Sequence, residues 1–388
     1  MNVRVSSPQS EEAERVLQAV QRREPQLIER IGELVAVESP SNSKAGVDQA
    51  QSLFATWAAA AGGKVRRYRH KDFGDSVSVT FRPNQSREPA IMLLGHLDTV
   101  WELGTLARMP WRVTRDRISG PGVLDMKAGV VMALTAIESL SELGLLKRPV
   151  TVLLHGDEEV GSPASRSLTE ELARKVESVY VLEPAQGESG AYKTARKAVG
   201  LYRLSVTGKA AHSGVDFEQG QSAILELARQ IQVLQEHTDL ARGITVNPGV
   251  IGGGTGSNVI AAEAWMEIDV RVARMRDVAK VDRSLRAMKP VNKACKVAVS
   301  GGMNRPPMER TPGTVSLFRR AQQMAELLRI PLDEAATGGG SDGNFTSALG
   351  IPTLDGMGAV GAGAHAAHEH IVRKHLVPRT ALLAAMLL

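Results

Sequence analysis

Residues 90–99 have the sequence AIMLLGHLDT, in which a short apolar run leads directly into a His-x-Asp motif. An uninterrupted run such as Ala90–Leu94 is typical of a strand that is buried on both faces. His96 and Asp98 follow the run, and residues two apart in an extended chain point to the same side. Taken alone, the motif is equally explained as a strand-end histidine whose ring is satisfied by an aspartate in a turn.

Two later runs, Val150–Leu154 and Val179–Leu182, have the same buried character. Segments with helical periodicity, Lys127–Leu143 and Ser167–Lys175, lie between the runs. Strands that alternate with helices in this way favour a parallel sheet covered by helices. We therefore expect a catalytic domain of the α/β class built on a mostly parallel sheet.

Further segments with helical spacing frame these strands. Glu11–Val37 is predicted to be one amphipathic helix, and Val47–Ala61 a second that stops at two glycines. Near the end of the chain, Gly313–Leu328 is predicted as a helix, and a last helix is expected from about Pro378.

The pattern changes after about Arg196. Strand-like and helix-like segments now follow in the order β-α-β-β-α-β, which suits a ferredoxin-like α+β domain. The chain of 388 residues also exceeds the ~250–300 at which a single core stops growing. We expect a catalytic domain from residues 1–195 and 308–388, with an inserted lid or dimerisation domain at residues 196–307. The lid segments are Tyr202–Thr207, Gly220–His237, Ile244–Ile251, Ala264–Val272, Val278–Met288 and Lys296–Ser300.

Composition and charge exclude several classes of function. The net charge of +5 is modest, and no basic run interleaved with aromatic residues is present, so nucleic acid is not expected as a partner. No stretch approaches the ~20 apolar residues of a membrane span, and the first residues lack the apolar core of a signal peptide. The single cysteine, Cys295, excludes an intrachain disulfide framework. We expect a soluble cytoplasmic protein.

Acidic residues follow the predicted strands. Asp157, Glu158 and Glu159 come after the second strand, and Glu183 comes directly after the third. Asp125 lies in a turn before a helix, where a helix N-cap is the simpler explanation. Three adjacent carboxylates repel one another unless cations neutralise them, although a solvated acidic loop remains an alternative. Because the carboxyl ends of parallel strands share one edge of a sheet, these side chains are expected to gather there.

A histidine-rich loop completes the set of polar groups. Gly361–Gly363 leads into a segment that contains His365, His368 and His370. Imidazole and carboxylate ligands without a thiolate suit Zn²⁺, with Mn²⁺ or Co²⁺ as substitutes. If five such ligands serve two ions, one of them must bridge the pair. A pair of ions roughly 3.5–4 Å apart would activate a water and stabilise a tetrahedral intermediate.

These motifs resemble a family of two-zinc peptidases that includes glutamate carboxypeptidase, acetylornithine deacetylase and succinyl-diaminopimelate desuccinylase. The stretch GHLDTVWELGTLARMPWRVTRDRISGPGVLDMKAG at residues 95–129 is especially similar to the folate-hydrolysing glutamate carboxypeptidase branch. The other matching blocks, in the family's order, are DEEVGS, LEP, TGKAAHSG, GSNVIAAEAWMEIDVR, TGGGSDGNF and HAAHEH. The resemblance implies the zinc-peptidase fold, with the inserted domain as a lid.

By this resemblance, five residues are the ligands of two Zn²⁺ ions. His96 and Glu183 hold one ion, Glu159 and His365 hold the other, and Asp125 bridges them. His365 is preferred to His368 because it precedes Glu369 by the family's spacing of four residues.

The resemblance also assigns roles to residues that do not bind metal. Glu158 matches the general base, and Asp98 matches the carboxylate that orients His96. The peptide bond Asp125-Met126 is expected to be cis, although many relatives have a second aspartate in place of Met126.

The resemblance further implies residues that bind substrate. His212 matches a histidine that reaches across a dimer interface, although a plain turn histidine in the lid is the alternative. Asn258 and Arg271 match residues that bind the carboxylate end of the substrate, and Arg305 is placed for a second basic contact. Gly339 and Ser341 would present backbone groups to the scissile bond, although a tight turn also explains these glycines.

The expected activity is hydrolysis of an amide bond beside a free carboxylate, with release of C-terminal glutamate or a similar amino acid from an N-acyl or pteroyl group. The enzymatic alternative is a deacylase of N-acyl amino acids, similar to acetylornithine deacetylase. A catalytically silent relative that binds a ligand through the lid is a third hypothesis, and a purely structural metal site a fourth. The resemblance implies a homodimer formed through the lid.

Overall fold

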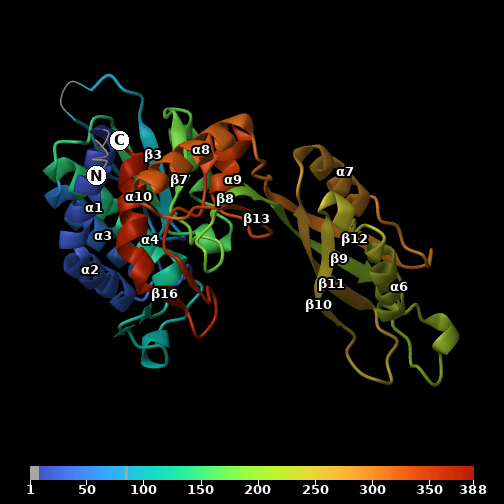
Figure 1. The fold of residues 1–388 in the computed structure, drawn as a ribbon. Helices are drawn as coiled ribbons and strands as arrows, with labels where there is room; N and C mark the ends of the chain where they lie inside the picture. The colour runs from blue at the N-terminus through green and yellow to red at the C-terminus, as the bar shows by residue number, and fades with distance from the viewer. Residues whose placement is uncertain (1–7, 84–85) are drawn as a thin grey trace. The chain divides into compact units, whose positions relative to one another are not determined.

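The computed structural model describes residues 8–83 and 86–388 and divides into two compact units. The first unit comprises Met1–Ala195, Arg310–Thr337 and Ser341–Leu388, and the second comprises Arg196–Glu309 with Gly338–Gly340. Residues 1–7, for which the sequence predicts no signal peptide, lie outside the described residues. Figure 1 shows the chain coloured from its N-terminus to its C-terminus.

The first unit is built on a six-stranded sheet in the order β1-β2-β6-β3-β7-β14. Strands β6, β3, β7 and β14 are parallel, and β1 and β2 form an antiparallel extension. The predicted parallel α/β core is thereby confirmed. The strands are β1 (Lys64–Tyr68), β2 (Ser76–Phe81), β3 (Ile91–His96), β6 (Val150–His155), β7 (Ser178–Val181) and β14 (Thr353–Leu354).

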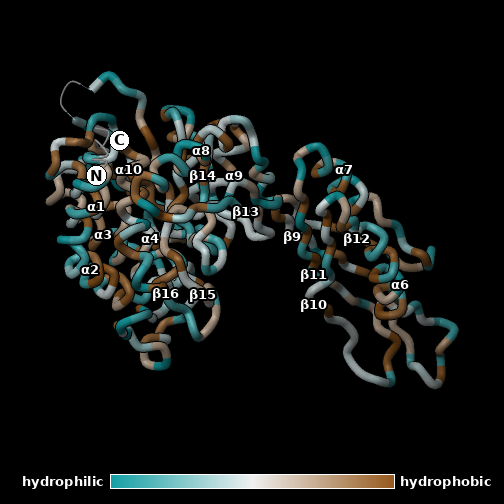
Figure 2. The backbone as a smooth tube through the Cα atoms, viewed as in Figure 1, coloured by the Kyte–Doolittle hydropathy of each residue, from teal (hydrophilic) through white to brown (hydrophobic). Residues whose placement is uncertain are grey.

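Both faces of this sheet are covered, which explains the uninterrupted apolar runs of its strands. Ile91 and Leu93 of β3 point into the large core, whereas Met92 and Leu94 belong to a smaller core on the other face. The large core is formed by α1 (Pro8–Arg22), α2 (Glu24–Ala36), α3 (Lys44–Ala60), α4 (Ala128–Glu142), α8 (Pro312–Leu327) and α10 (Leu376–Met386). The smaller core lies beside α5 (Arg166–Ala173) and α9 (Gly343–Ala348). In Figure 2, teal and brown alternate along α2 and α3, as expected for helices with one buried side.

The single helix predicted over Glu11–Val37 is a wrong prediction. The structure has two helices, α1 and α2, which meet at Arg23. Pro25 lies in the first turn of α2, where its missing N–H group costs no helical hydrogen bond. Apolar residues on both sides of the break still face the same core, so periodicity alone does not reveal the break.

A small four-stranded sheet carries the loops beside the strand ends. Its order is β15-β16-β5-β4, and all of its pairs are antiparallel. It joins β4 (Arg112–Val113) and β5 (Arg117–Ser119) to β15 (Gly361–Ala362) and β16 (His370–Val372). The histidine-rich loop, residues 363–369, therefore begins and ends in this sheet. Figure 1 shows β16 in red beside the blue-green segment of β4 and β5.

The second unit has the element order β9-α6-β10-β11-α7-β12, which confirms the β-α-β-β-α-β prediction. Its sheet has the antiparallel order β10-β11-β9-β12 of a ferredoxin-like fold, and its buried residues form one core. The elements are β9 (Ala198–Thr207), α6 (Ala223–Gln235), β10 (Thr245–Gly253), β11 (Glu263–Val272), α7 (Met275–Arg286) and β12 (Lys296–Arg305). Within the described residues, no helix combines the length and hydrophobicity that crossing a membrane requires.

Candidate metal centre

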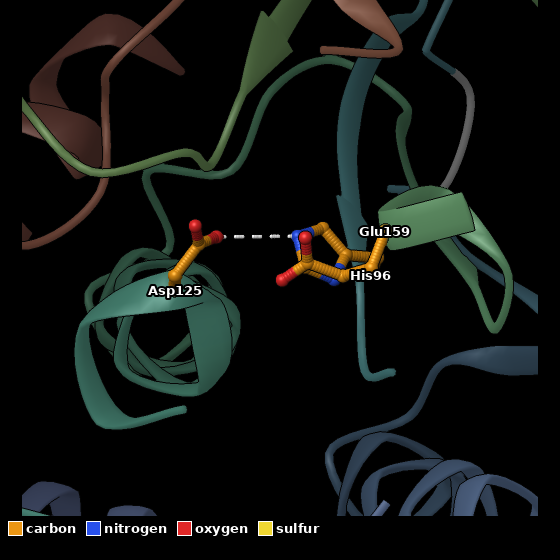
Figure 3. Close-up of side chains that lie close together, drawn as sticks. All are labelled: His96, Asp125 and Glu159. Carbon is orange, nitrogen blue, oxygen red and sulfur yellow. Dashed lines mark ion pairs between the residues drawn. The ribbon is translucent and has the colours of Figure 1, made fainter. Parts of the chain in front are cut away.

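Two histidines and three carboxylates from five separate segments meet beside the strand ends. His96 Nε2 lies 3.3 Å from Asp125 Oδ1 and 3.5 Å from Glu183 Oε1. His365 Nε2 lies 3.3 Å from Asp125 Oδ2 and 3.2 Å from Glu159 Oε2. The two oxygens of Asp125 thus face different imidazoles. Figure 3 shows His96, Asp125 and Glu159 converging, with the His96–Asp125 contact dashed.

The contacts that are missing in this cluster support a metal. His96 Nε2, Asp125 Oδ1 and Glu159 Oε1 are buried and have no hydrogen-bond partner among the described residues. Buried polar atoms normally have hydrogen-bond partners, so three unsatisfied atoms on neighbouring side chains need an explanation. Ligand atoms of His96, Asp125 and Glu159 lie within 4.8 Å of one another, as do those of His96, Glu158 and Glu183. The donor types and their spacing fit divalent cations such as Zn²⁺.

The pKa values of the clustered residues also support a cation site. Burial and the charge of Asp125 raise the pKa of Glu159 to about 7, although His365 opposes the rise. Contacts with Asp125 and Glu159 raise the pKa of His365 to about 10. Burial alone would raise the pKa of Asp125, but the imidazoles of His365 and His96 outweigh it and hold that pKa well below its usual range. The concentrated negative charge thus attracts positive charge, which protons or a divalent cation can supply.

The three adjacent acidic residues after β6, Asp157–Glu159, have different surroundings. Asp157 is buried and accepts hydrogen bonds from the backbone N–H groups of Ala164 (2.7 Å) and Ser165 (3.1 Å). It therefore stabilises the start of the following helical segment and does not face the cluster. Glu158 does face it, with Oε2 4.0 Å from His96 Nε2. The alternative that these residues form a solvated acidic loop is therefore wrong.

Asp98 connects the first strand to this triplet. The ring of His96 lies closer to the backbone carbonyl of Asp98 (Nδ1 to O, 2.9 Å) than to its carboxylate (Nδ1 to Oδ1, 3.4 Å). The carboxylate instead accepts from the Ser41 hydroxyl at 2.7 Å and from the N–H groups of Glu158 and Glu159 at 3.2 and 3.1 Å. Asp98 thus fixes the backbone of the two glutamates as well as the position of the His96 ring.

Glu369 is a further residue of the site, which the sequence marks only by its spacing from His365. It is 1% exposed, and its carboxylate accepts from the Trp101 indole (2.7 Å) and from the N–H groups of Gly122 (2.9 Å), Leu124 (2.8 Å) and Asp125 (3.1 Å). These bonds fix the turn that carries Asp125. The carboxylate is the only acidic group of the HAAHEH block, but nothing in the sequence connects it to residues 122–125.

The backbone around the cluster has two unusual features. The Asp125-Met126 peptide bond is cis, as the resemblance predicts. His365 has a φ of +61°, in the left-handed region that residues other than glycine seldom occupy. Its side chain is half exposed and reaches the two carboxylates, whereas His368 is exposed and forms no ion pair with a described residue. His370 is buried, and its Nδ1 contacts the carbonyl of His368 at 2.8 Å.

The expected substrate residues of the second unit lie in two places. The strand-like bridge between His212 and Val259 brings His212 beside Asn258, whose carbonyl accepts from Ser213 N–H at 3.0 Å. His212 Nδ1 accepts from Gly214 N–H at 3.1 Å, a bond typical of a turn. The second place is the glycine loop Gly338–Gly340.

Three arginines border the glycine loop. Arg271 donates to Asp269 at 2.8 Å through both Nε and Nη2, and its Nη1 donates to the Gly338 carbonyl at 3.3 Å. Arg196, which the sequence analysis missed, donates to the carbonyls of Gly339 and Gly340 at 3.2 and 3.1 Å. A Cβ on Gly340 would lie 2.7 Å from Cγ2 of Val199 and 2.9 Å from Cδ of the buried Arg305, so a larger residue would require these side chains to shift.

Ser341 belongs to the first unit. Its hydroxyl donates to Asp355 at 2.6 Å and accepts from Gly343 N–H at 3.1 Å. The whole residue is fully buried in the first unit.

Comparisons with known proteins agree with this geometry. A sequence profile described as "Peptidase family M20/M25/M40" matches residues 92–388. Carboxypeptidase G2 from Pseudomonas sp. (strain RS-16) is 28% identical over 382 residues, which cover 96% of this chain and 91% of the relative. An acetylornithine deacetylase from Yersinia pseudotuberculosis is 26% identical over 275 residues, 64% of this chain and 68% of the relative. Among solved structures, aminopeptidase PepT from Bacillus cereus has the same fold, with a TM-score of 0.78 and 22% sequence identity. The match covers 94% of this chain and 98% of the PepT chain.

The network around Glu369 can be tested by Glu369→Gln. The amide would place an NH₂ group against backbone N–H donors, and leaving such buried groups unsatisfied costs about 1–3 kcal/mol each. We expect a lower free energy of unfolding, measured by urea denaturation of the metal-free protein. We also expect weaker retention of metal during dialysis, because the turn with Asp125 loses its anchor.

The matched control is Glu102→Gln, which removes one charge from an exposed position on the segment that carries Trp101. Equal unfolding free energies and metal contents in the two variants would contradict the role of Glu369.

Proposed function

The chain belongs to the peptidase family M20/M25/M40, whose members are metal-dependent hydrolases, and from this premise we propose that it is a two-zinc carboxypeptidase. In this proposal it hydrolyses an amide bond beside a free carboxylate and releases glutamate or a similar amino acid from an N-acyl or pteroyl group. The observation that carries the proposal is the Asp125 carboxylate, whose two oxygens each lie 3.3 Å from a different imidazole. That arrangement suits a carboxylate that bridges two ions.

Five residues would hold the ions. His96 and Glu183 would bind one, Glu159 and His365 the other, and Asp125 both. Bound there, two divalent cations would supply a water of lowered pKa and a Lewis acid beside the scissile carbonyl. The silent-relative and structural-site hypotheses are less well supported, because a non-ligand carboxylate, Glu158, faces the same cluster.

Glu158 is the general base in this proposal. Its carboxylate takes a proton from the attacking water as the new C–O bond forms, and returns the proton to the leaving nitrogen as the C–N bond breaks. Asp98 is a positioning residue for this step, because its carboxylate fixes the N–H groups of both Glu158 and Glu159. A base held at its backbone loses little further freedom when the substrate binds.

The second unit is proposed as the lid that recognises the carboxylate of the substrate, with His212, Asn258, Arg271, Arg305 and Gly339 as contacts. Ser341, which belongs to the first unit, is proposed as a further substrate contact. Arg271 uses one N–H on each of its three nitrogens for Asp269 and Gly338, so two of its five N–H groups remain for a ligand. Asp269 holds the guanidinium plane in place, and a planar guanidinium matches the two oxygens of a carboxylate.

A second candidate function is the removal of an acyl group from an N-acyl amino acid. It is favoured by the likeness to acetylornithine deacetylase, which covers 64% of this chain. The glutamate carboxypeptidase proposal is preferred because the likeness to carboxypeptidase G2 covers 96%. Both functions use the same cluster and differ in the group beside the scissile bond.

The choice between the two metal-ligand histidines predicts different metal contents for two variants. His365→Ala removes an imidazole 3.2 Å from Glu159, so we expect the metal content to fall from two ions to about one per chain and turnover to be lost. Elemental analysis after dialysis measures the metal. His368→Ala is the matched control, since it removes an imidazole three positions away that forms no ion pair or hydrogen bond with the five ligands. Two ions retained in His365→Ala, with loss in His368→Ala, would reverse the assignment.

The substrate proposal is tested by assaying the zinc-loaded enzyme on folate, methotrexate and N-acetylornithine. We expect glutamate release from folate or methotrexate that a chelator abolishes and zinc restores. We expect much slower turnover of N-acetylornithine. The opposite preference would establish the deacylase.

The matched control for this assay is Glu158→Gln, which preserves size and removes the base. We expect kcat to fall by about 10²–10⁴-fold with both metals retained. Unchanged turnover in this variant would exclude Glu158 as the base, whichever substrate is preferred.

We further propose a homodimer formed through the second unit. Exposed apolar side chains are numerous on α6 and the segment before it, including Phe217 (64% exposed) and Leu225 (59%). The edge strand β10 adds Ile251, and exposed apolar groups beside an open strand edge favour association. Sedimentation velocity should show a dimer that Phe217→Asp with Leu225→Asp dissociates. The control Val65→Asp, on the edge strand of the first unit, should leave the dimer intact, and a monomeric wild-type protein would contradict the proposal.

A further inference from the structure

A basic cavity of about 340 Å³ lies within the first unit, apart from the five metal-ligand side chains. It is bordered by the segment from Arg108 to Gly120 and by the end of the histidine-rich loop. The charged and titratable groups that line it are Arg108, Arg112, Arg117, His368, Glu369 and His370. Its volume is within the ~300–1,000 Å³ typical of sites for small molecules.

The small sheet arranges these side chains on one face. Arg112 of β4 and His370 of β16 are both paired with Ser119 of β5, so the three lie in one row across the strands. Arg117 is two residues from Ser119 on the same strand and therefore points to the same side. The alternate residue, Ile118, is fully buried on the other face. The arginines are thus presented together by regular backbone pairing.

The positive charge of the cavity is not balanced by the protein. The guanidinium groups of Arg108, Arg112 and Arg117 form no ion pair and no hydrogen bond with a described residue. Glu369 is the one carboxylate in the lining, so three guanidinium groups face a single negative charge there. Like charges gathered in a concave site repel one another and raise the local concentration of anions.

We propose that this cavity, defined by Arg108, Arg112, Arg117 and His370, binds a small, multiply charged oxyanion, of which inorganic phosphate is the simplest. Guanidinium groups bind phosphate and carboxylate oxygens in pairs of parallel hydrogen bonds. Three guanidinium groups favour a ligand with more than one negative charge. The volume leaves room for an organic group beside the charged one.

The site has a structural connection to the metal cluster. His370 is the neighbour of Glu369, which holds the turn with Asp125, and the same loop carries His365. An anion that contacts both the β4–β5 hairpin and His370 connects the two segments. Its binding therefore restrains the loop from its far end without contact with the metal ligands.

The test uses the zinc-loaded enzyme titrated with inorganic phosphate by calorimetry at constant ionic strength. The key variant is Arg112→Gln with Arg117→Gln. The matched control is Arg115→Gln, an exposed arginine in the turn of the same hairpin that does not line the cavity. Phosphate that binds the zinc ions directly gives the same signal in all three proteins, so the difference between the variants isolates the cavity.

We expect phosphate to bind wild type and Arg115→Gln alike, and the double variant at least about tenfold more weakly at the cavity. In hydrogen-exchange mass spectrometry, phosphate should protect peptides from residues 108–119 in the first two proteins only. A parallel titration with glutarate distinguishes a carboxylate ligand from a phosphate-bearing one. Identical isotherms and identical protection in all three proteins would overturn the proposal.

Discussion

The structure depends on the placement of one carboxylate, that of Asp125, between two imidazoles. Each of its oxygens lies 3.3 Å from a different histidine, so a small rotation of the group would lose one of the contacts. The turn that carries it is held by Glu369, a buried carboxylate that accepts from three backbone N–H groups of that turn and from an indole. Burial raises the pKa of Glu369 and the backbone N–H groups oppose the rise, so these bonds offset the cost of placing the charge there.

The parallel sheet supplies the rest of the cluster. His96 ends β3, Glu158 and Glu159 follow β6, and Glu183 follows β7, so three adjacent strands deliver their polar residues to one edge. Asp98 then ties two of these strand ends together, since it lies beside the His96 ring and binds the N–H groups of both glutamates. Main-chain hydrogen bonds therefore hold Glu158 and Glu159 at this edge, and apolar cores cover both faces of the sheet that carries them.

Much of this arrangement can be predicted from sequence, because it follows from local patterns. Apolar runs such as Ala90–Leu94 identify strands buried on both faces, and a polar residue directly after such a run must lie at the sheet edge. The break between α1 and α2 at Arg23 is not predicted, because apolar residues on both helices face one core and preserve the periodicity. Asp157 is indistinguishable from its two neighbours in sequence, and only the fold turns it toward Ala164 and Ser165.

Long-range polar contacts account for what the sequence does not reveal. Glu369 acts on residues about 245 positions earlier in the chain, and no periodicity or spacing connects the two. The surroundings of its two histidine neighbours likewise cannot be predicted from the sequence. His368 and His370 compete with His365 as ligands in sequence, yet the short strand β16 turns this end of the loop toward the arginines of β5 and β4. Glu369 thus lies between a cluster rich in carboxylates and a cavity rich in guanidinium groups. Its carboxylate is held by neutral N–H groups, and the three arginines outnumber this one carboxylate in the lining of the cavity, which leaves an excess of positive charge there.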